Sequence, residues 1–184
     1  VTGLRYARGG ACERDGIEPD IVAMGKALGN GVPISAIVAD SSIMQWFARN
    51  DPIFISSTHH GDTLGLGAAD FVLDYIQNGE YLEHIYRIGL ALINDLVDVG
   101  LTVLGNEPRS LVTFGTNEER AMFIHYMAQK CVIMNRPNFP SMAHNIFDVD
   151  RTADAAERYI AESKEMSIEQ INDLYGDRLP RMLF

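Results

Sequence analysis

The sequence predicts an α/β chain that ends in a smaller α+β unit. In the first half, apolar runs of strand length at residues 21–24 and 34–39 precede helical apolar spacing at residues 63–77 and 80–98. After Gly100, two strand-like runs stand next to each other, ahead of helical segments. Apolar residues make up 47% of the 184 residues, which is enough to build a hydrophobic core.

The first half predicts a loop, two strands and a short helix before the longer helices. Residues 1–18 carry glycines among arginines and predict an irregular loop. The two apolar runs are rich in small and branched side chains, so they predict buried strands. Residues 43–47 predict a short helix with Asp40, Ser41 or Ser42 as its cap.

The segment at residues 80–98 predicts a long core helix that ends at Gly100. Its apolar side chains repeat at the spacing of a packing stripe, and Gly89 within the stripe permits close approach of a neighbouring element. We place the domain boundary in this helix. Residues 1–94 are expected to be the C-terminal part of a large domain, and residues 95–184 a small α+β domain.

The α+β unit is predicted to begin with a hairpin. Strand-like runs at residues 101–104 and 110–114 flank a turn that contains glycine, asparagine and proline. Thr116 and Glu119 have the spacing of a capping box, which predicts a helix from there to about residue 130. Residues 131–134 predict a further strand.

Structural roles such as helix capping can explain the polar residues near the C-terminus. Asp150 or Thr152 is predicted to open a helix, so Asp148 and Asp150 need not be a metal-binding pair. A lone histidine after two apolar residues, as at His144, favours a structural role. Residues 167–170 carry another capping-box pattern, which predicts a last helix.

Lys26 is the candidate catalytic residue. It follows a strand-like run and Gly25, and the glycines at positions 29 and 31 allow a ligand to approach the backbone. At the end of a buried strand the side chain would be partly desolvated, which favours the neutral amine as a nucleophile or a Schiff-base former. The alternative is an ordinary exposed lysine in a surface turn.

Ser57 and Thr58 are the candidate phosphate-binding residues. They precede the predicted helix at residues 63–77, and the N-terminus of a helix offers free N–H groups and a favourable dipole to an anion. The alternative is that one of them only caps the helix. The adjacent His59 and His60 do not predict a metal site, because neighbouring residues seldom face one ion together.

Composition argues against several classes of partner. A net charge of -10 and a pI near 4.8 predict neither nucleic-acid nor anionic-membrane binding. No apolar stretch of about 18 residues predicts a membrane span. Cys12 and Cys131 lie far apart without a CxxC partner, so we expect no zinc site and no disulfide framework, but free thiols in the cytoplasm.

Three blocks of sequence resemble class III aminotransferases, and the glutamate-1-semialdehyde aminomutase-like branch in particular. The first block includes Gly9-Gly10-Ala11, Gly16-Ile17-Glu18-Pro19-Asp20-Ile21, Gly25-Lys26 and Gly29-Asn30-Gly31-Val32-Pro33. The second is Ser56-Ser57-Thr58-His59-His60-Gly61-Asp62-Thr63-Leu64-Gly65-Leu66-Gly67-Ala68-Ala69. The third is Pro140-Ser141-Met142-Ala143-His144 with residues 148–156. The blocks occur in the family's order.

This resemblance implies a fold type I transferase that uses pyridoxal 5'-phosphate (PLP). Lys26 would be its Schiff-base lysine, and Thr58, with Ser57 beside it, would reach the phosphate of the neighbouring subunit in a homodimer. The implied reaction moves an amino group between a small-molecule amino donor and a carbonyl acceptor, as an aminotransferase or an aminomutase. An amino acid, an amino aldehyde or a keto sugar is the expected substrate.

The resemblance also leaves alternatives open. The family's aspartate for the pyridine nitrogen and its phosphate-binding turn lie upstream of the segment that matches Thr2-Gly3, so this chain resembles the C-terminal part of a longer enzyme. It could therefore be a non-catalytic fragment or a dimerisation module. A PLP racemase or decarboxylase of the same fold would use Lys26 too. Residues 59–63 depart from the Phe-Gly-Gly-Asn-Pro that the aminomutase often has, which argues against a strict semialdehyde aminomutase.

Overall fold

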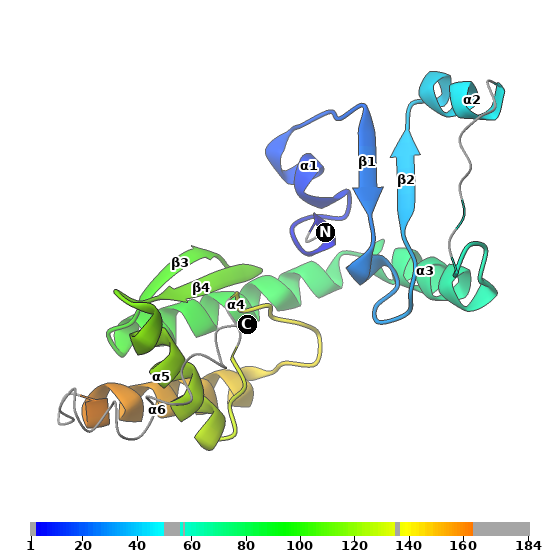
Figure 1. The fold of residues 1–184 in the computed structure, drawn as a ribbon. Helices are drawn as coiled ribbons and strands as arrows, with labels where there is room; N and C mark the ends of the chain where they lie inside the picture. Colours follow the sequence, from blue (N-terminus) through cyan, green and yellow to red (C-terminus); the bar gives the residue numbers. More distant parts are fainter. Residues whose placement is uncertain (1–2, 50–55, 57, 135–136, 164–184) are drawn as a thin grey trace. The chain divides into compact units, whose positions relative to one another are not determined.

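The computed structural model describes residues 3–49, 56, 58–134 and 137–163 (Figure 1). The chain forms two compact units, Val1–Leu82 and Glu83–Phe184. The long helix α4 (Glu80–Asp98) begins in the first unit and continues into the second. The predicted boundary between residues 94 and 95 falls inside this helix, and as a boundary between enzyme domains it stays a prediction.

The first unit contains an antiparallel pair of short strands. β1 (Ile21–Met24) pairs with β2 (Ala36–Ala39), and Ile21 lies opposite Ala39. Both strands occur where the apolar runs predicted them. The prediction that they are buried is wrong for this chain, because Ile21 is 54% and Ile37 64% exposed. A two-stranded sheet has no further strand to shelter its side chains.

Short helices surround this strand pair. In chain order they are η1 (Gly3–Arg5), α1 (Gly10–Asp15), η2 (Lys26–Leu28), α2 (Ser41–Arg49) and α3 (Thr63–Ile76). The prediction of an irregular loop over residues 1–18 is wrong where α1 forms. The Glu13 carboxylate accepts a hydrogen bond from the N–H of Gly9 at the start of α1, and Gly16, in the left-handed conformation at φ 64°, closes it.

Two predicted helices of the first unit are confirmed. α2 begins after Asp40, whose carboxylate accepts a hydrogen bond from the N–H of Ser42 at 2.8 Å. That bond and the side-chain hydrogen bond with Ser42 hold the pKa of Asp40 below its usual range. α3 covers almost the whole range expected from its apolar spacing.

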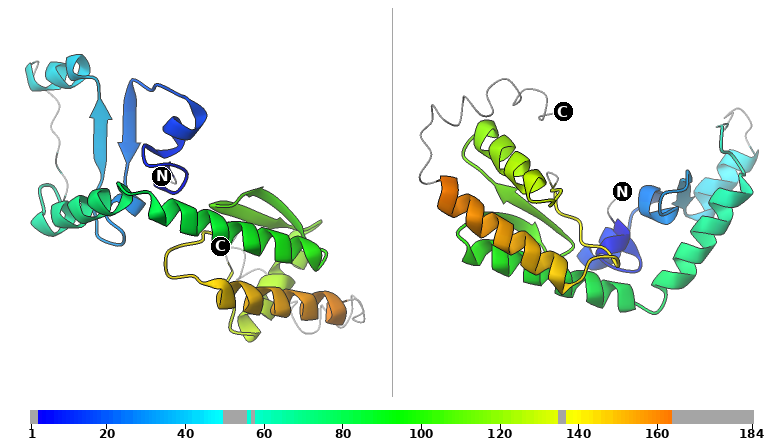
Figure 2. Two further views of the ribbon diagram at one scale, coloured as in Figure 1. Left: turned by 180° about the vertical axis from the view of Figure 1, so that it is seen from behind. Right: turned by 90° about the horizontal axis from the view of Figure 1, so that it is seen from below.

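The second unit joins a β-hairpin to three helices (Figure 2). Its elements after α4 are β3 (Thr102–Asn106), β4 (Arg109–Thr113), α5 (Asn117–Gln129) and α6 (Ile146–Ser163). The strands pair antiparallel, with Thr102 opposite Thr113, which confirms the predicted hairpin. The Thr116–Glu119 capping box is also confirmed: each side chain accepts a hydrogen bond from the other residue's N–H, at 3.1 and 3.2 Å.

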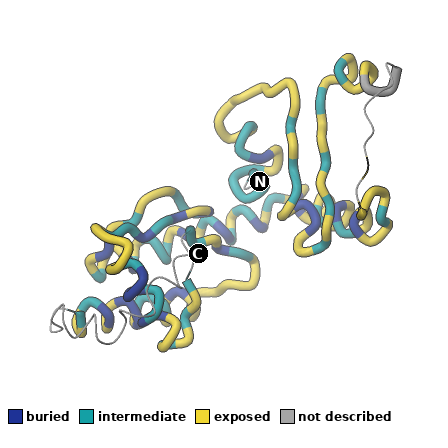
Figure 3. Tube along the Cα trace, in the orientation of Figure 1, coloured by how far each residue is buried: buried dark blue, intermediate teal, exposed yellow. Residues whose placement is uncertain are grey.

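The core of the second unit lies between the hairpin, α4, α5 and α6. Phe123 of α5 is 1% exposed, and its ring centroid lies 5.1 Å from that of Phe114 and 5.2 Å from that of Tyr159. Leu96 and Met127 are fully buried beside them. Figure 3 shows the buried positions spread over these elements. Aromatic edge and face contacts of this kind add to the apolar area that the core buries.

The predicted packing stripe of α4 is confirmed. Ile85 and Leu96 are buried, and Gly89 lies against the hairpin turn. A Cβ at Gly89 would stand 1.9 Å from the carbonyl oxygen of Glu107, so no side chain fits there. Gly100, at φ 96°, ends the helix as predicted, and the N–H of Leu101 then donates to the Leu96 carbonyl at 3.0 Å.

Two predictions for the second unit are wrong. Residues 131–134 pair with no strand in the described part of the chain, because Cys131 turns the backbone at φ 60° and Val132 donates its N–H back to Met127. α6 begins at Ile146, not at Asp150 or Thr152. Asn145 Oδ1 accepts from the N–H of Phe147, and Asp148 accepts from the N–H of Asn145, both at 2.9 Å, so this earlier cap starts the helix. The helix predicted after residue 167 lies outside the described residues.

Candidate functional site

Lys26 lies in a tight turn on the chain segment between β1 and β2. Its φ is 49°, in the left-handed region that few residues other than glycine and asparagine adopt. The N–H groups of Gly29 and Asn30 both donate to the Lys26 carbonyl at 3.1 Å. These hydrogen bonds hold the lysine in an unusual backbone conformation, and conformations of this kind cluster at functional sites.

Steric limits and backbone conformation explain why glycines follow Lys26 at positions 29 and 31. A Cβ at Gly29 would stand 2.1 Å from the carbonyl oxygen of Val32, and Gly31 has a φ of 104°. Leu28, only 3% exposed, anchors the turn from within. The glycines are therefore needed to form the turn itself. The sequence had predicted a different role for them, which is to let a ligand approach the backbone.

Helix α3 packs against this turn. A Cβ at Gly65, in the first turn of α3, would stand 2.9 Å from the carbonyl oxygen of Pro33 and 3.5 Å from the Ile34 side chain. The two segments that carry the candidate residues are far apart in sequence, and this contact joins them. Among the described residues, no hydrogen bond or ion pair links Lys26 directly to Thr58.

The Lys26 side chain is exposed. The prediction that it is partly desolvated is wrong for this chain, because β1 and β2 are themselves exposed and give the turn no enclosed surroundings. In the part of the chain that the structure describes, no ion pair engages its Nζ. The side chain is therefore accessible to a small molecule.

Thr58 lies in the exposed turn at residues 58–61, ahead of α3. The alternative that Thr58 caps α3 is wrong, because Asp62 is the N-cap and accepts a hydrogen bond from the N–H of Leu64 at 3.2 Å. Sequence reasoning missed this cap, although an aspartate directly before helical spacing is a usual signal for one. Ser57 lies outside the described residues. His59 Nδ1 lies 3.7 Å from an Asp62 carboxylate oxygen.

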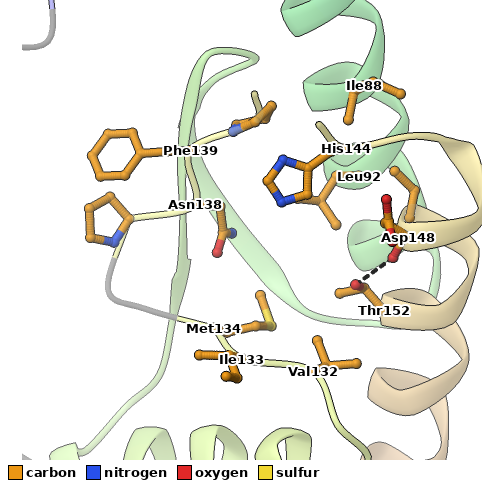
Figure 4. A pocket seen from close by; sticks show the side chains of 13 residues that line it. Ile88, Leu92, Val132, Ile133, Met134, Asn138, Phe139, His144, Asp148 and Thr152 are labelled. Carbon is orange, nitrogen blue, oxygen red and sulfur yellow. Dashed lines mark hydrogen bonds between the residues drawn. The ribbon is translucent and has the colours of Figure 1, made fainter. Parts of the chain in front are cut away.

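A separate pocket of about 290 Å³ lies in the second unit (Figure 4). His144 and Asn138 face it across an apolar wall that includes Leu92 and Met134. The N–H of Ser141 donates to His144 Nδ1 at 3.1 Å. His84 Nε2 lies 2.8 Å from the His144 carbonyl oxygen, which ties this loop to α4. These contacts give His144 the structural role that its sequence context favoured.

The described residues contain neither a candidate membrane span nor a candidate metal site. No helix there is both long and apolar enough to cross a bilayer. No group of three or more histidine, cysteine, aspartate or glutamate side chains there could hold a metal ion.

The sequence model of one protein family, described as aminotransferase class-III, matches residues 1–105, which include the Lys26 turn, α3 and α4. The chain belongs to this family. The Lys26 turn therefore lies within the part of the chain that matches the family.

Curated relatives of this class-III chain include glutamate-1-semialdehyde 2,1-aminomutases. The protein of Methanobrevibacter smithii is 28% identical over 85% of this chain and 42% of its own length. That of Methanosarcina acetivorans is 29% identical over 84% of this chain and 42% of its own length. The chain thus spans about two fifths of these relatives, and the predicted resemblance to the aminomutase branch is confirmed.

Solved structures give the same fold. The PLP internal aldimine form of the FumI protein of Sphingopyxis sp. MTA144 has a TM-score of 0.79, with 26% identity over 89% of this chain and 41% of that one. An omega-transaminase of Sphaerobacter thermophilus has a TM-score of 0.77, with 17% identity over 88% and 43% of the two chains. The predicted α/β fold of a fold type I transferase is confirmed.

Proposed function

We propose that this class-III chain is part of a PLP-dependent enzyme that transfers amino groups, with Lys26 as the lysine that holds the cofactor. The observation that carries the proposal is the Lys26 turn. It lies within the family match, its backbone is held at φ 49°, and glycine at position 29 is the only residue that fits beside it. The FumI relative, 26% identical, is described with PLP in its internal aldimine form.

The residues present fit PLP. The Lys26 amine is exposed and in no ion pair among the described residues, so an aldehyde can reach it. The Thr58 hydroxyl is exposed and not used as the cap of α3, which leaves it available to a phosphate, and Ser57 is the second candidate in that segment. When bound, PLP supplies an electron-withdrawing ring that stabilises negative charge at the substrate carbon.

The proposed catalytic work of Lys26 is proton transfer. With PLP and an amino substrate bound, Lys26 Nζ would be the group that takes a proton from the substrate carbon and returns it at another position. The left-handed backbone of Lys26 and the two hydrogen bonds to its carbonyl hold the Cα atom from which the side chain extends. Orientation of this kind lowers the entropic part of the barrier.

The proposed substrates are a small-molecule amino donor and a carbonyl acceptor. An amino acid, an amino aldehyde or a keto sugar fits this class, and the curated relatives are aminomutases while several structural neighbours are transaminases. Residues 59–63 are where this chain departs from the aminomutase pattern. We therefore favour transfer between two molecules over transfer within one.

We further propose a homodimer. The α4 stripe lends no support, because Ile85 and Leu96 of that helix are buried within the chain itself. The support comes from α3, where Leu64 is 67% and Phe71 69% exposed. Apolar side chains this exposed and close together on one helix are typical of a surface that another chain covers. Light scattering that gives a monomer mass for the whole protein at micromolar concentration would rule the dimer out.

A cytoplasmic location completes the proposal. Both cysteines are free thiols, with Cys12 half-buried and Cys131 exposed, which suits a reducing compartment. The net charge of -10 gives no attraction to nucleic acid or to an anionic membrane.

The test of Lys26 is reductive trapping. The chain is mixed with PLP, the carbonyl–amine linkage is reduced with borohydride, and the modified lysine is found by peptide mass mapping. Lysine occurs only at positions 26, 130 and 164, so each site gives its own peptide. Lys130 is the internal control, because its Nζ already lies over the Tyr126 ring at 4.8 Å from the centroid.

Label concentrated on Lys26, and lost in Lys26→Arg but kept in Lys130→Arg, supports the proposal. Arginine keeps the positive charge of Lys26 but forms no such linkage, so the comparison separates covalent capture from attraction of the phosphate. Label spread evenly over the three lysines would show that the turn has no special affinity for PLP and would overturn the proposal.

A further inference from the structure

Two arginines line one pocket of the second unit. The pocket, of about 610 Å³, is lined by residues of β4, the start of α5 and Pro137. Arg109 comes from the first position of β4 and Arg120 from the first turns of α5. This pocket shares Pro137 with the one that His144 lines, but its other lining residues come from β4, residues 114–116 and the start of α5.

The positions of Arg109 on its strand and of Arg120 on its helix explain why both residues line one pocket. Side chains alternate between the two faces of a strand, so Arg109 shares its face with Leu111 and Thr113, while Ser110 and Val112 are buried on the other. On α5, Arg120 follows Asn117 by three residues and therefore lies on the same side of the helix. Both arginines therefore line the pocket, one from the hairpin and one from the helix.

Among the described residues that line this pocket there is no aspartate and no glutamate. The Glu119 carboxylate lies beside the lining, where it accepts hydrogen bonds from the N–H groups of Gly115 and Thr116. Within the described ranges, neither Arg109 nor Arg120 forms a side-chain ion pair. Acidic residues outnumber basic ones by 25 to 15 in the whole chain, so two unpaired cations in one concavity stand out against the overall charge.

Several of the neighbouring polar groups already have hydrogen-bond partners. The Thr116 hydroxyl accepts from the N–H of Glu119, and the Glu119 carboxylate accepts from the N–H groups of Gly115 and Thr116. The Thr113 hydroxyl donates to the Thr102 carbonyl at 3.2 Å. The Thr116 hydroxyl keeps its own O–H to donate, and the two guanidinium groups are the only charged donors in the described lining.

The remaining wall of the pocket is apolar. Leu111, Phe114 and Pro137 line it and are only half-buried, so their side chains remain open to a ligand. A site with two cations beside an apolar wall matches a molecule that carries an anionic group on an apolar body. Arginine prefers planar carboxylates, which its forked donors can bind in pairs.

We propose that this pocket binds the carboxylate of a small organic acid with an apolar body. The Arg109 and Arg120 guanidinium groups hold the carboxylate, and Leu111 and Phe114 contact the apolar part. The site belongs to the second unit and uses neither Lys26 nor Thr58, so it is independent of the proposed cofactor site.

The test is a titration of the whole ¹⁵N-labelled chain with phenylacetate, followed by amide chemical shifts. We expect the amides of Gly115 and Asn117 to shift and saturate. Arg109→Gln and Arg120→Gln should each weaken binding about tenfold, the scale of one charge-assisted hydrogen bond. Arg158→Gln is the matched control, since it removes the same charge from an exposed position on α6 outside the pocket.

Two further probes separate charge from apolar contact. Phenylacetamide keeps the ring but not the charge, and inorganic phosphate keeps charge without the ring, so both should bind at least tenfold more weakly than phenylacetate. Equal binding of phenylacetamide would overturn the role of the arginines, and equal binding of phosphate would overturn the choice of an organic acid. An equal loss in Arg158→Gln would reduce the effect to net charge and refute the site. Arg109 is exposed, so its variant tests the site even if Arg120→Gln fails to fold.

Discussion

The close contact between α4 and the hairpin turn predicts that Gly89→Ala destabilises the chain. An alanine in the interior of a helix is normally favoured over glycine by about 1 kcal/mol. At Gly89 the added Cβ would stand 1.9 Å from the Glu107 carbonyl oxygen and 2.5 Å from its carbonyl carbon. Ordinary contact begins at 3.4 Å, so the turn backbone must move. Propensity and sterics therefore act in opposite directions at this position.

The steric effect should win. Forcing an extra carbon into a packed site costs about 1–3 kcal/mol, and a backbone carbonyl, unlike a flexible side chain, cannot rotate away. The cost thus lies at the upper end or beyond it, and after the gain in propensity we expect a net loss of about 2 kcal/mol in the free energy of unfolding. For a chain of this size, that lowers the thermal midpoint by roughly 4–8 °C.

Gly67→Ala is the matched control for thermal unfolding followed by circular dichroism. Gly67 lies inside α3, and a Cβ there would meet nothing within 4 Å. The same substitution should therefore raise stability by up to about 1 kcal/mol. A Gly89→Ala chain as stable as the wild type, or stabilised as much as Gly67→Ala, would refute the close approach of α4 to the hairpin turn.

Three further predictions concern the first unit. Thr58→Ala should weaken PLP binding by about 1–2 kcal/mol in a fluorescence titration without loss of helix content, and unchanged affinity would remove Thr58 from the proposed site. Asp62→Ala should instead destabilise the chain by about 1 kcal/mol through loss of the α3 cap, measured by urea unfolding, and no change in the midpoint would contradict the cap. Ser42→Ala should raise the pKa of Asp40 part of the way toward its ordinary value in a carbon-detected NMR titration, because it removes the side-chain hydrogen bond, the larger cause of the lowering, and keeps the backbone one. The pKa of Asp40 is lowered in the folded chain, so the carboxylate stabilises the fold above the usual carboxyl range, and this stabilisation is lost as the pH falls through the lowered pKa. A pKa of Asp40 that is as low in Ser42→Ala as in the wild type would contradict the role of the Ser42 side chain.

Much of the local structure could be predicted from the sequence because short-range rules govern it. The capping box at Thr116 and the glycine stop at Gly100 depend on residues within a turn of each other, and both are confirmed. The same holds for the two antiparallel hairpin partners β3 and β4. Lys26 was predicted from a strand-like run followed by glycines, and the structure places it on such a turn.

The failures also have local causes. Asn145 and Asp148 form a cap one turn earlier than the aspartate that the sequence favoured, and two plausible caps in a row cannot be ranked without their geometry. Residues 131–134 have strand-like composition, but a strand needs a partner, and composition does not say whether one is available.

The sequence by itself determined the family, the order of most helices and strands, and the choice of Lys26, because these depend on residue types at fixed spacing. Only the tertiary structure decided which polar groups are free. It showed that Asp62, and not Thr58, caps α3, that Lys26 is exposed, and that Arg109 and Arg120 line one pocket. The physical reason is that the exposure of Lys26 and the lining of the pocket are set by contacts between segments distant in the chain, whereas the Asp62 cap is local and needed only the choice between several capping residues in a row.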